Sequence, residues 1–462
     1  MKKFIIVILL IGLTLKAADK PNIIVIVADD LGYADVSFGA QEKPALETPS
    51  VDRLAKEGVM LNRFYACPVC SPTRVGTMTG KWPNRLGLMK AVIPPWRNRG
   101  LEPEILTLPE ILAQNGYNRR AVVGKWHLGH SDVKYHPLNQ GFTHFYGHLN
   151  GAIDYFTHER ENENDWHRND KPAFEKGYAT DLLADYTVKF IDESVKEKEP
   201  FFIYLPFNAP HSPFQAPEEE INQMKDFQGL RKTYAAMVKS MDKGIGRILD
   251  KLDELKIADN TFILFYSDNG GVGKVSFPNH LRDGKFSVYE GGVRVVAAAR
   301  WPKGGISGGG KIDSKPIGYI DVLPTVCEVA GINFSKYAST NQFDGKNVLD
   351  VMQGKSPGPD RHWFSYIHQS PAQEHYSVIK DSYKLVVKIP HNKKKSGSPK
   401  IELYNLNEKP LEKNDIADHH PDVVKEMLKE LEVFKQFQKN PLPFYGDGRK
   451  GFKAPKDWNI FK

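Results

Sequence analysis

Two acidic or amide pairs stand where buried strands are expected to end. Asp29-Asp30 follows an apolar run at residues 22–28, and Asp268-Asn269 follows another at residues 261–266. In open α/β sheets, ligands bind at the carboxyl ends of the strands, so the two pairs could converge on one metal. Their oxygen ligands suit Ca²⁺ or Mg²⁺ and not zinc. Either pair alone could instead form a turn, because Asp, Asn and Gly are common turn residues.

A possible nucleophile lies in the segment Cys70-Ser-Pro-Thr-Arg74. The proline favours the start of a helix, which would place Cys70 at a helix N-terminus, where anions are favoured. Arg74 would follow one turn later on the same side. This arrangement suits a nucleophile that faces an anionic substrate. Cys67 completes a C-x-x-C pattern, so a redox dithiol is an alternative, and a zinc site is less favoured because no second cysteine pair exists.

The elements that must position these side chains alternate along the chain. We expect strands at residues 22–28, 120–125, 200–207, 261–266 and 293–299, and helices at residues 48–57, 108–115, 179–195, 230–255 and 320–330. This alternation predicts an α/β fold with a large, mostly parallel mixed sheet sandwiched by helices.

The pattern changes after residue 355, where Ser356-Pro-Gly-Pro359 would break any regular element. Strands are then expected at residues 362–368, 376–379, 384–389 and 402–404, a helix at 421–437, and an irregular tail from Asn440. The prediction is a catalytic domain at residues 19–355. A C-terminal α+β subdomain, with a small antiparallel sheet and one helix, would occupy residues 356–462.

The first 18 residues are typical of a signal peptide. Two lysines precede the apolar run at residues 4–15, and small residues follow at Ala17 and Ala18. That run is short for a membrane span, although an uncleaved anchor is an alternative. Cleavage would lower the formal charge from +7 to +4, because it removes three lysines and no acids. We therefore expect an exported bacterial protein, periplasmic or secreted, with no stable membrane span after cleavage.

Composition excludes several classes of protein. With 40% hydrophobic and 26% charged residues, the chain is neither disordered nor collagen-like. Three cysteines cannot form a disulfide framework. Because the positive charge is modest and no recognition motif is present, nucleic-acid binding is not expected.

The Cys70-x-Pro-x-Arg74 segment resembles the signature of the type I, formylglycine-dependent sulfatases, within the alkaline-phosphatase-like superfamily. Other segments resemble that family in the same order, and the matches span about residues 21–440. These segments are residues 21–33, 124–129, 208–211, 267–271 and 285–294.

The resemblance implies a cofactor and a modification. Asp29, Asp30, Asp268 and Asn269 match the family's calcium ligands, and Cys70 belongs to the same metal site. Cys70 also matches the cysteine that a formylglycine-generating maturation enzyme converts to 3-oxoalanine, an aldehyde whose hydrate attacks sulfur.

The resemblance also implies roles for the surrounding side chains, which would stabilise charge on a sulfate ester. Arg74 and Lys125 would hold the diol and the sulfate oxygens, and His127 would act as the base that releases sulfate. His211 and Lys285 would bind the sulfate and help protonate the leaving alcohol. Taken singly, each histidine could be a structural residue.

Two segments, residues 154–160 and 211–219, look most like the arylsulfatase B branch, which removes the 4-sulfate of N-acetylgalactosamine. This implies a sulfated oligo- or polysaccharide as substrate, with a 4-O-sulfate on a galacto-configured sugar of an algal galactan or a glycosaminoglycan. Tyr155, His158 and Trp166 are candidate sugar contacts, although ordinary packing would explain them equally well. Lys393–Lys395 and Lys400 could attract a polyanion or be a solvated hairpin tip.

Two alternative functions stay open. One is a phosphatase or phosphonate hydrolase of the same superfamily, which would use Ser or Thr as nucleophile, two zinc ions and more histidine ligands. The other is a non-catalytic carbohydrate-binding protein in which Cys70 is unmodified.

Overall fold

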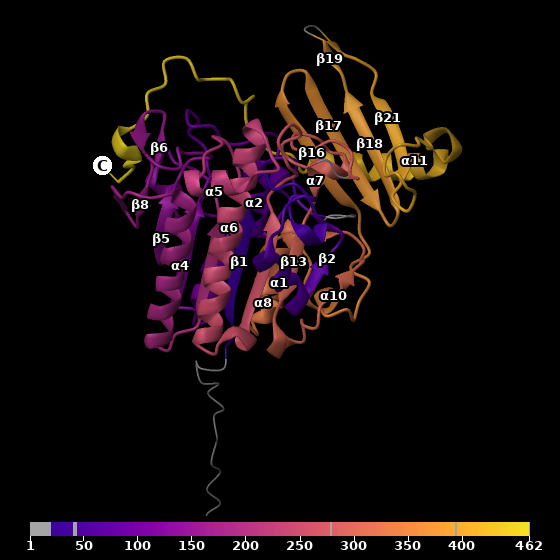
Figure 1. Ribbon diagram of the computed structural model, residues 1–462. Helices are drawn as coiled ribbons and strands as arrows, with labels where there is room; N and C mark the ends of the chain where they lie inside the picture. The colour runs from indigo at the N-terminus through magenta and orange to yellow at the C-terminus, as the bar shows by residue number, and fades with distance from the viewer. Residues whose placement is uncertain (1–19, 40–43, 278–279, 393–394, 462) are drawn as a thin grey trace, which may run out of the picture.

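The computed structural model describes residues 20–39, 44–277, 280–392 and 395–461. The predicted signal peptide, and Lys393 and Lys394 of the basic loop, lie outside these ranges. Within them, the largest element is a ten-stranded mixed sheet (Figure 1). Its centre consists of four parallel strands, in the order β11 (Thr261–Ser267), β1 (Asn22–Ala28), β10 (Phe201–Pro206) and β4 (Arg119–Lys125).

Strand β1 is buried on both faces of the sheet. Ile24 and Ile26 belong to the core on one side, whereas Val25 and Val27 belong to the core on the other. A strand in this position needs apolar side chains at every residue, and β-branched ones suit it best. The continuous apolar run therefore predicted this strand correctly.

Helices cover both faces of the sheet, which confirms the predicted α/β sandwich. One face packs against α1 (Pro49–Glu57), α4 (Ala179–Lys196) and α6 (Gly229–Glu254), of which α4 and α6 lie in front in Figure 1. The other face packs against α2 (Cys70–Thr79), α3 (Leu108–Gln114) and α8 (Val322–Val329).

The sheet is extended on both sides, mostly by short strands. Beyond β4 lie the parallel β5 (His144–His148) and the antiparallel β8 (His167–Arg168) and β9 (Lys171–Pro172). Beyond β11 lie β13 (Ala297–Arg300), β2 (Val59–Leu61) and β14 (Lys311–Ile312). The β13 strand is antiparallel to β11, so the sheet is mixed.

The single strand expected at residues 293–299 is wrong. Val293 ends the short helix α7 (Glu290–Val293), and β12 (Arg294–Val295) then pairs with β3 (Phe64–Tyr65) in a separate three-stranded sheet. After Val296 the chain joins the large sheet as β13. A continuous apolar run in the sequence does not show that its two halves pair with strands of different sheets.

The C-terminal part forms the predicted antiparallel sheet with one helix. Its strands are β16 (Trp363–Ser370), β17 (Gln373–Lys380), β18 (Tyr383–Ile389) and β21 (Lys400–Asn405), and α11 (Pro421–Gln436) packs against it. This sheet stands beside the large-sheet body in Figure 1. Buried Lys384 of β18 connects the two parts, because its Nζ lies 2.9 Å from Glu290 and 2.8 Å from Glu412.

The tail after residue 440 is largely irregular, as expected, but it does not stay with the C-terminal sheet. It crosses back to the large-sheet body, as Figure 1 shows in yellow. The Leu442 amide donates to the Gly87 carbonyl at 3.0 Å, and Trp458 Nε1 donates to the Arg160 carbonyl at 2.9 Å. The unit predicted as residues 356–462 is thus a sheet with its helix, followed by a strap across the catalytic body. No helix in the described ranges is both long and apolar enough to cross a membrane.

Candidate active site

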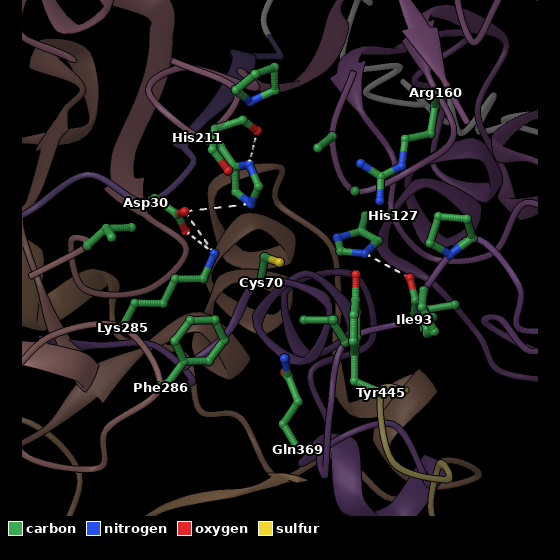
Figure 2. A pocket seen from close by; sticks show the side chains of 18 of the residues that line it. Asp30, Cys70, Ile93, His127, Arg160, His211, Lys285, Phe286, Gln369 and Tyr445 are labelled. Atoms are coloured by element: carbon green, nitrogen blue, oxygen red, sulfur yellow. Dashed lines mark hydrogen bonds and ion pairs between the residues drawn. The ribbon is translucent and has the colours of Figure 1, made fainter. Parts of the chain in front are cut away.

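The predicted catalytic and metal-binding residues converge at one edge of the large sheet. The four central strands are adjacent and parallel, so their carboxyl ends meet there. A cavity of about 640 Å³ opens at this edge (Figure 2). Each strand is followed by site residues: Asp268 and Asn269 after β11, Asp29 and Asp30 after β1, His211 after β10, and Lys125 and His127 at the end of β4.

Cys70 is the first residue of α2, as its proline pattern predicted. Its side chain is 2% exposed and lines the cavity, between His211 and Lys285 on one side and His127 on the other (Figure 2). Burial raises the pKa of the Cys70 thiol, so an unmodified thiol would stay neutral and be a poor nucleophile.

The structure does not favour a redox dithiol. Cys67, Cys70 and Cys327 are all free and buried. Burial raises the pKa of the Cys67 thiol to about 12, whereas reactive dithiols carry a thiol with a lowered pKa.

Two buried cations hold the carboxylates beneath Cys70. Arg74 Nη2 lies 2.6 Å from Asp268 Oδ2, and Lys125 Nζ lies 2.6 Å from Asp29 Oδ2. All four side chains are fully buried. Arg74 also donates to the Lys125 carbonyl at 3.1 Å, which ties the start of α2 to the end of β4.

Lys285 and His211 flank Asp30 at the cavity wall. Lys285 Nζ lies 2.6 Å from Asp30 Oδ1, and His211 Nε2 lies 3.6 Å from Asp30 Oδ2. Burial disfavours the charged ammonium, but the Asp30 carboxylate prevails and raises the pKa of Lys285. Burial likewise lowers the pKa of His211 to about 3, which leaves the imidazole neutral near neutral pH.

His127 is fixed in one orientation. Its Nε2 donates to the Ile93 carbonyl at 3.0 Å, so Nδ1 must carry the lone pair, and this buried atom has no hydrogen-bond partner among the described residues. Burial lowers the pKa of His127 well below its ordinary value. A Cβ on Gly151 would lie 2.5 Å from the imidazole ring, so glycine is required beside it. A neutral, oriented imidazole of this kind can act as a base.

Strained backbone accompanies two of these residues. Asp30 has φ 65° and His127 has φ 55°, in the left-handed region that residues other than glycine seldom adopt. Such strain persists where the surrounding structure demands it, and it is common at functional sites.

The acidic cluster fits a hard cation. Asp29 Oδ1 and Asn269 Oδ1 are buried, and within the described part of the chain neither accepts a hydrogen bond. Ligand atoms of Asp29, Cys70 and Asp268 lie within 4.8 Å of one another. Burial and the neighbouring Asp29 carboxylate raise the pKa of Asp268 to about 6, which a dication would counteract. Carboxylate and amide oxygens make up most of this donor set, so it suits Ca²⁺ or Mg²⁺.

The structure contradicts the expectation that the three candidate residues contact the sugar, because they lie away from the cavity. Tyr155, His158 and Trp166 are at most 1% exposed and do not line the cavity. The Tyr155 hydroxyl donates to the carbonyls of Asn208 and His211, so it shapes the loop that carries His211. His158 stacks on Trp166 with ring centroids 4.6 Å apart.

The cavity is also lined by residues that the sequence alone did not indicate. Arg160 enters from the hairpin of β6 (Glu159–Arg160) and β7 (Glu163–Asn164), Gln369 from the C-terminal sheet, and Tyr445 from the tail. No local motif marks them, because distant segments bring them together. In the basic loop, Lys400 forms an ion pair with Glu402 at 2.8 Å.

This fold and site define a hydrolase of the alkaline-phosphatase-like superfamily. The chain belongs to the sulfatase family: the family described as "Sulfatase" matches residues 21–332, which is most of the chain. A second family, "N-sulphoglucosamine sulphohydrolase, C-terminal", matches residues 280–437. The protein is therefore a sulfuric ester hydrolase.

Similar proteins carry sulfatase names. "Arylsulfatase J" of Mus musculus is 28% identical and aligns with 92% of this chain and 77% of its own length. "N-acetylgalactosamine-6-sulfatase" of Sus scrofa is 34% identical, over 73% of this chain and 67% of its own length.

Solved structures agree with the fold. Ps i-CgsB in complex with k-i-k-neocarrahexaose has a TM-score of 0.83 and 30% identity, and the match covers 93% of this chain and 95% of that chain. BT4656 in complex with D-glucosamine-2-N,6-O-disulfate has a TM-score of 0.71, over 93% of this chain and 100% of that chain. At 22% identity, the second match supports the fold alone.

Proposed function

We propose that this protein hydrolyses a sulfate ester of a carbohydrate, using formylglycine made from Cys70 and a bound Ca²⁺. The observation that carries the proposal is the convergence of buried carboxylates and cations around Cys70, at the base of a cavity. The names of its relatives support a carbohydrate substrate. One is a sulfatase of N-acetylgalactosamine, and Ps i-CgsB holds an oligosaccharide.

The carboxylates and the amide after β1 and β11 would hold Ca²⁺, which would neutralise charge on sulfate oxygens. Formylglycine would supply, as its hydrate, an oxygen nucleophile for attack on the sulfate ester. Both groups fit the residues around them: most of the donor atoms are oxygens, and Cys70 lies among them at the cavity base. The residues assigned to this metal site are Asp29, Asp30, Asp268, Asn269 and Cys70.

Side chains of the protein itself would perform the other steps, which are sulfate binding, proton transfer and charge stabilisation. Lys285 and His211 border the cavity, so both can bind the sulfate, and the protonated Lys285 ammonium can donate a proton toward the leaving alcohol. His127 can accept a proton at Nδ1, because Nε2 is committed to Ile93. Arg74 and Lys125 lie deeper, where they orient the carboxylates and supply positive charge.

The first test is the mass of the peptide that contains Cys70, after expression with a formylglycine-generating maturation enzyme. The proposal expects a loss corresponding to replacement of the thiol by an aldehyde. If only unmodified cysteine is found in protein that has been exposed to the active maturation enzyme, the non-catalytic alternative gains support.

We further propose a galacto-configured sugar with a 4-O-sulfate as the group attacked. The resemblance to the arylsulfatase B branch favours position 4, whereas the relative named N-acetylgalactosamine-6-sulfatase shares the sugar but differs in position. Sulfate release from galactosamine 4-sulfate, galactosamine 6-sulfate and glucosamine 6-sulfate oligosaccharides separates these possibilities. Faster release from the glucosamine substrate would contradict the galacto assignment.

We also propose export through the leader at residues 1–18. The proposal rests on its lysines, apolar run and small residues. Fractionation of the producing cell, together with the N-terminal mass of the mature protein, tests it. An intact N-terminus on protein in the cytoplasmic fraction would contradict export.

A further inference from the structure

We propose that Arg160 forms a second anion-binding subsite in the active-site cavity. It would bind a carboxylate or a second sulfate on the substrate, distinct from the sulfate that is hydrolysed. This inference rests on the proposed function, since it concerns the glycan that enters the same cavity.

Arg160 is presented by a tight hairpin. The strands β6 and β7 pair through Arg160 and Glu163, and the two turn residues, Glu161 and Asn162, have φ of 51° and 63°. Two-residue turns with positive φ hold hairpin strands in a defined register. The guanidinium reaches into the cavity next to His127, on the side away from Cys70 and Lys285 in Figure 2.

The charge of Arg160 is poorly compensated within the protein. Among the described residues, the one carboxylate within 4.0 Å is that of Glu161, 3.8 Å from Nη2. Arg160 Nε is buried and has no hydrogen-bond partner in the described ranges. The other cation that lines the cavity, Lys285, instead lies 2.6 Å from Asp30.

This difference defines the ligand class. A substrate that covered Arg160 without offering an anion would leave a desolvated guanidinium unpaired, which is unfavourable. The planar guanidinium matches two oxygens of one carboxylate or sulfate. Because Arg160 and Lys285 lie on different sides of His127, we assign them to two anionic groups of one glycan.

The hairpin is also held in place by the C-terminal tail. Glu163 accepts hydrogen bonds from Lys456 Nζ at 3.2 Å and from the Asp457 amide at 3.0 Å. Trp458, which is 1% exposed, donates to the Arg160 carbonyl at 2.9 Å. Its ring packs edge-on against His130, with centroids 5.4 Å apart. A side chain on so well supported a backbone is preorganised for binding.

The test compares three substrates that share one galacto-configured disaccharide. The first carries only the scissile sulfate, the second carries an additional sulfate, and the third carries a uronate carboxylate on the neighbouring sugar. For Arg160→Gln, we expect the ratio of kcat/KM on a dianionic substrate to kcat/KM on the monosulfated one to fall about 10- to 100-fold. Arg160→Lys should lower the ratio less, because it keeps the charge but loses the planar fork.

A matched control is Arg168→Gln. Arg168 lies in β8, next to the edge strand β9, is 49% exposed and pairs with Glu175 at 2.6 Å, outside the cavity. For Arg168→Gln, the ratio of kcat/KM on a dianionic substrate to kcat/KM on the monosulfated one should match that of the wild type. Whichever dianionic substrate responds to Arg160 identifies the source of the anion. An unchanged ratio for Arg160→Gln on both dianionic substrates would overturn the proposal.

A binding measurement keeps this result separate from the proposed chemistry. In a Cys70→Ala background, calorimetry with the same disaccharides should show that Arg160→Gln weakens binding of a dianionic one by a similar factor. If the wild type releases no sulfate but this difference in binding is found, the proposed hydrolysis is contradicted and the Arg160 subsite is supported. If sulfate is released and Arg160→Gln weakens binding of all three disaccharides equally, the Arg160 subsite is contradicted and the proposed hydrolysis is supported.

Discussion

Among the buried clusters of charge in the described ranges, two invite comparison, and members of one of them line the cavity at the sheet edge. The site cluster surrounds Cys70 and consists of Arg74, Lys125 and Lys285 with Asp29, Asp30 and Asp268. The interface cluster joins the C-terminal sheet to the large-sheet body and consists of Lys384, Glu290 and Glu412. The members of both clusters are at most 2% exposed, except Lys285, whose side chain is 7% exposed.

The clusters differ in how their oxygens are used. In the site cluster, Asp29 Oδ1 accepts no hydrogen bond from the described residues, and neither does Oδ1 of the adjacent Asn269. In the interface cluster, the two oxygens of Glu290 accept from Lys384 at 2.9 Å and from the Tyr65 hydroxyl at 3.1 Å. Glu412 Oε1 also accepts no hydrogen bond from the described residues, but it lies 2.8 Å from the Lys384 ammonium, whereas Asp29 Oδ1 is 3.8 Å from Arg74 Nη2. Buried charge alone therefore does not identify a functional site. Ligand donor atoms that converge at the edge of a cavity are the feature that identifies a candidate site.

The largest expected effect comes from Cys70→Ala in the site cluster. Turnover should fall at least about 10⁴-fold, because the variant cannot form the nucleophile. The unfolding midpoint should stay close to that of the wild type. Released sulfate and thermal unfolding are the measurements.

Cys327→Ala is the control for this change, since Cys327 is equally buried but lies away from the cavity. It should cost about 1 kcal/mol of stability and keep turnover. Retained turnover in Cys70→Ala would refute the role of Cys70.

Next in size is Lys384→Met in the interface cluster. It leaves two buried glutamates without their cation, so the free energy of unfolding should fall by about 3–5 kcal/mol. Turnover per folded molecule should not change. Urea unfolding measures the loss, and adding Glu412→Gln should restore part of it. Loss of turnover at unchanged stability would mean that the two clusters are not functionally distinct.

Asp268→Asn should separate metal binding from folding. Removing this carboxylate should lower bound Ca²⁺ and reduce turnover about 100-fold or more. Elemental analysis and calcium titration are the readouts. Glu412→Gln is the matched buried acid and should keep its calcium. Equal calcium content in Asp268→Asn and the wild type would count against the proposed site.

The smallest effect concerns pH and the interface cluster. Burial, reinforced by Glu290 and opposed by Lys384, raises the pKa of Glu412 from 4.5 to about 7. The folded state then holds this proton more tightly than the unfolded state. The contribution of Glu412 to stability is thus full below pH 4.5 and is lost as pH rises through 7.

Urea unfolding of the wild type and Glu412→Gln across this range provides the check. The stability of the wild type relative to the variant should decrease by at most about 3 kcal/mol as pH rises, and then level off. A relative stability that rises with pH would reverse the assignment.

The sequence predicted the site cluster well because its determinants are local. A strand buried on both faces is recognisable from seven consecutive residues, and Asp29-Asp30 follows β1 directly. Pro72 marks the start of α2 and so places Cys70 at the helix N-terminus. Parallel neighbours then bring these ends together without any further information.

The outer wall of the cavity could not be predicted in this way. Arg160 and Trp458 are separated by 298 positions, and no periodicity links them. Tyr155 was misread because an aromatic residue in a loop can face a sugar or the backbone, and only the fold shows that its hydroxyl donates to Asn208 and His211. The function of such residues depends on contacts between segments far apart in the chain.

The strap formed by the tail has a consequence for the order of folding and for proteolysis. Because Trp458 and Arg160 are 298 positions apart, the support of Arg160 can form only after the residues between them have been synthesised. A protease cut in the strap between Tyr445 and Trp458 would disconnect this support from the C-terminal sheet while leaving the residues around Cys70 untouched. Preparations with a cut strap should therefore differ first in their choice among oligosaccharides.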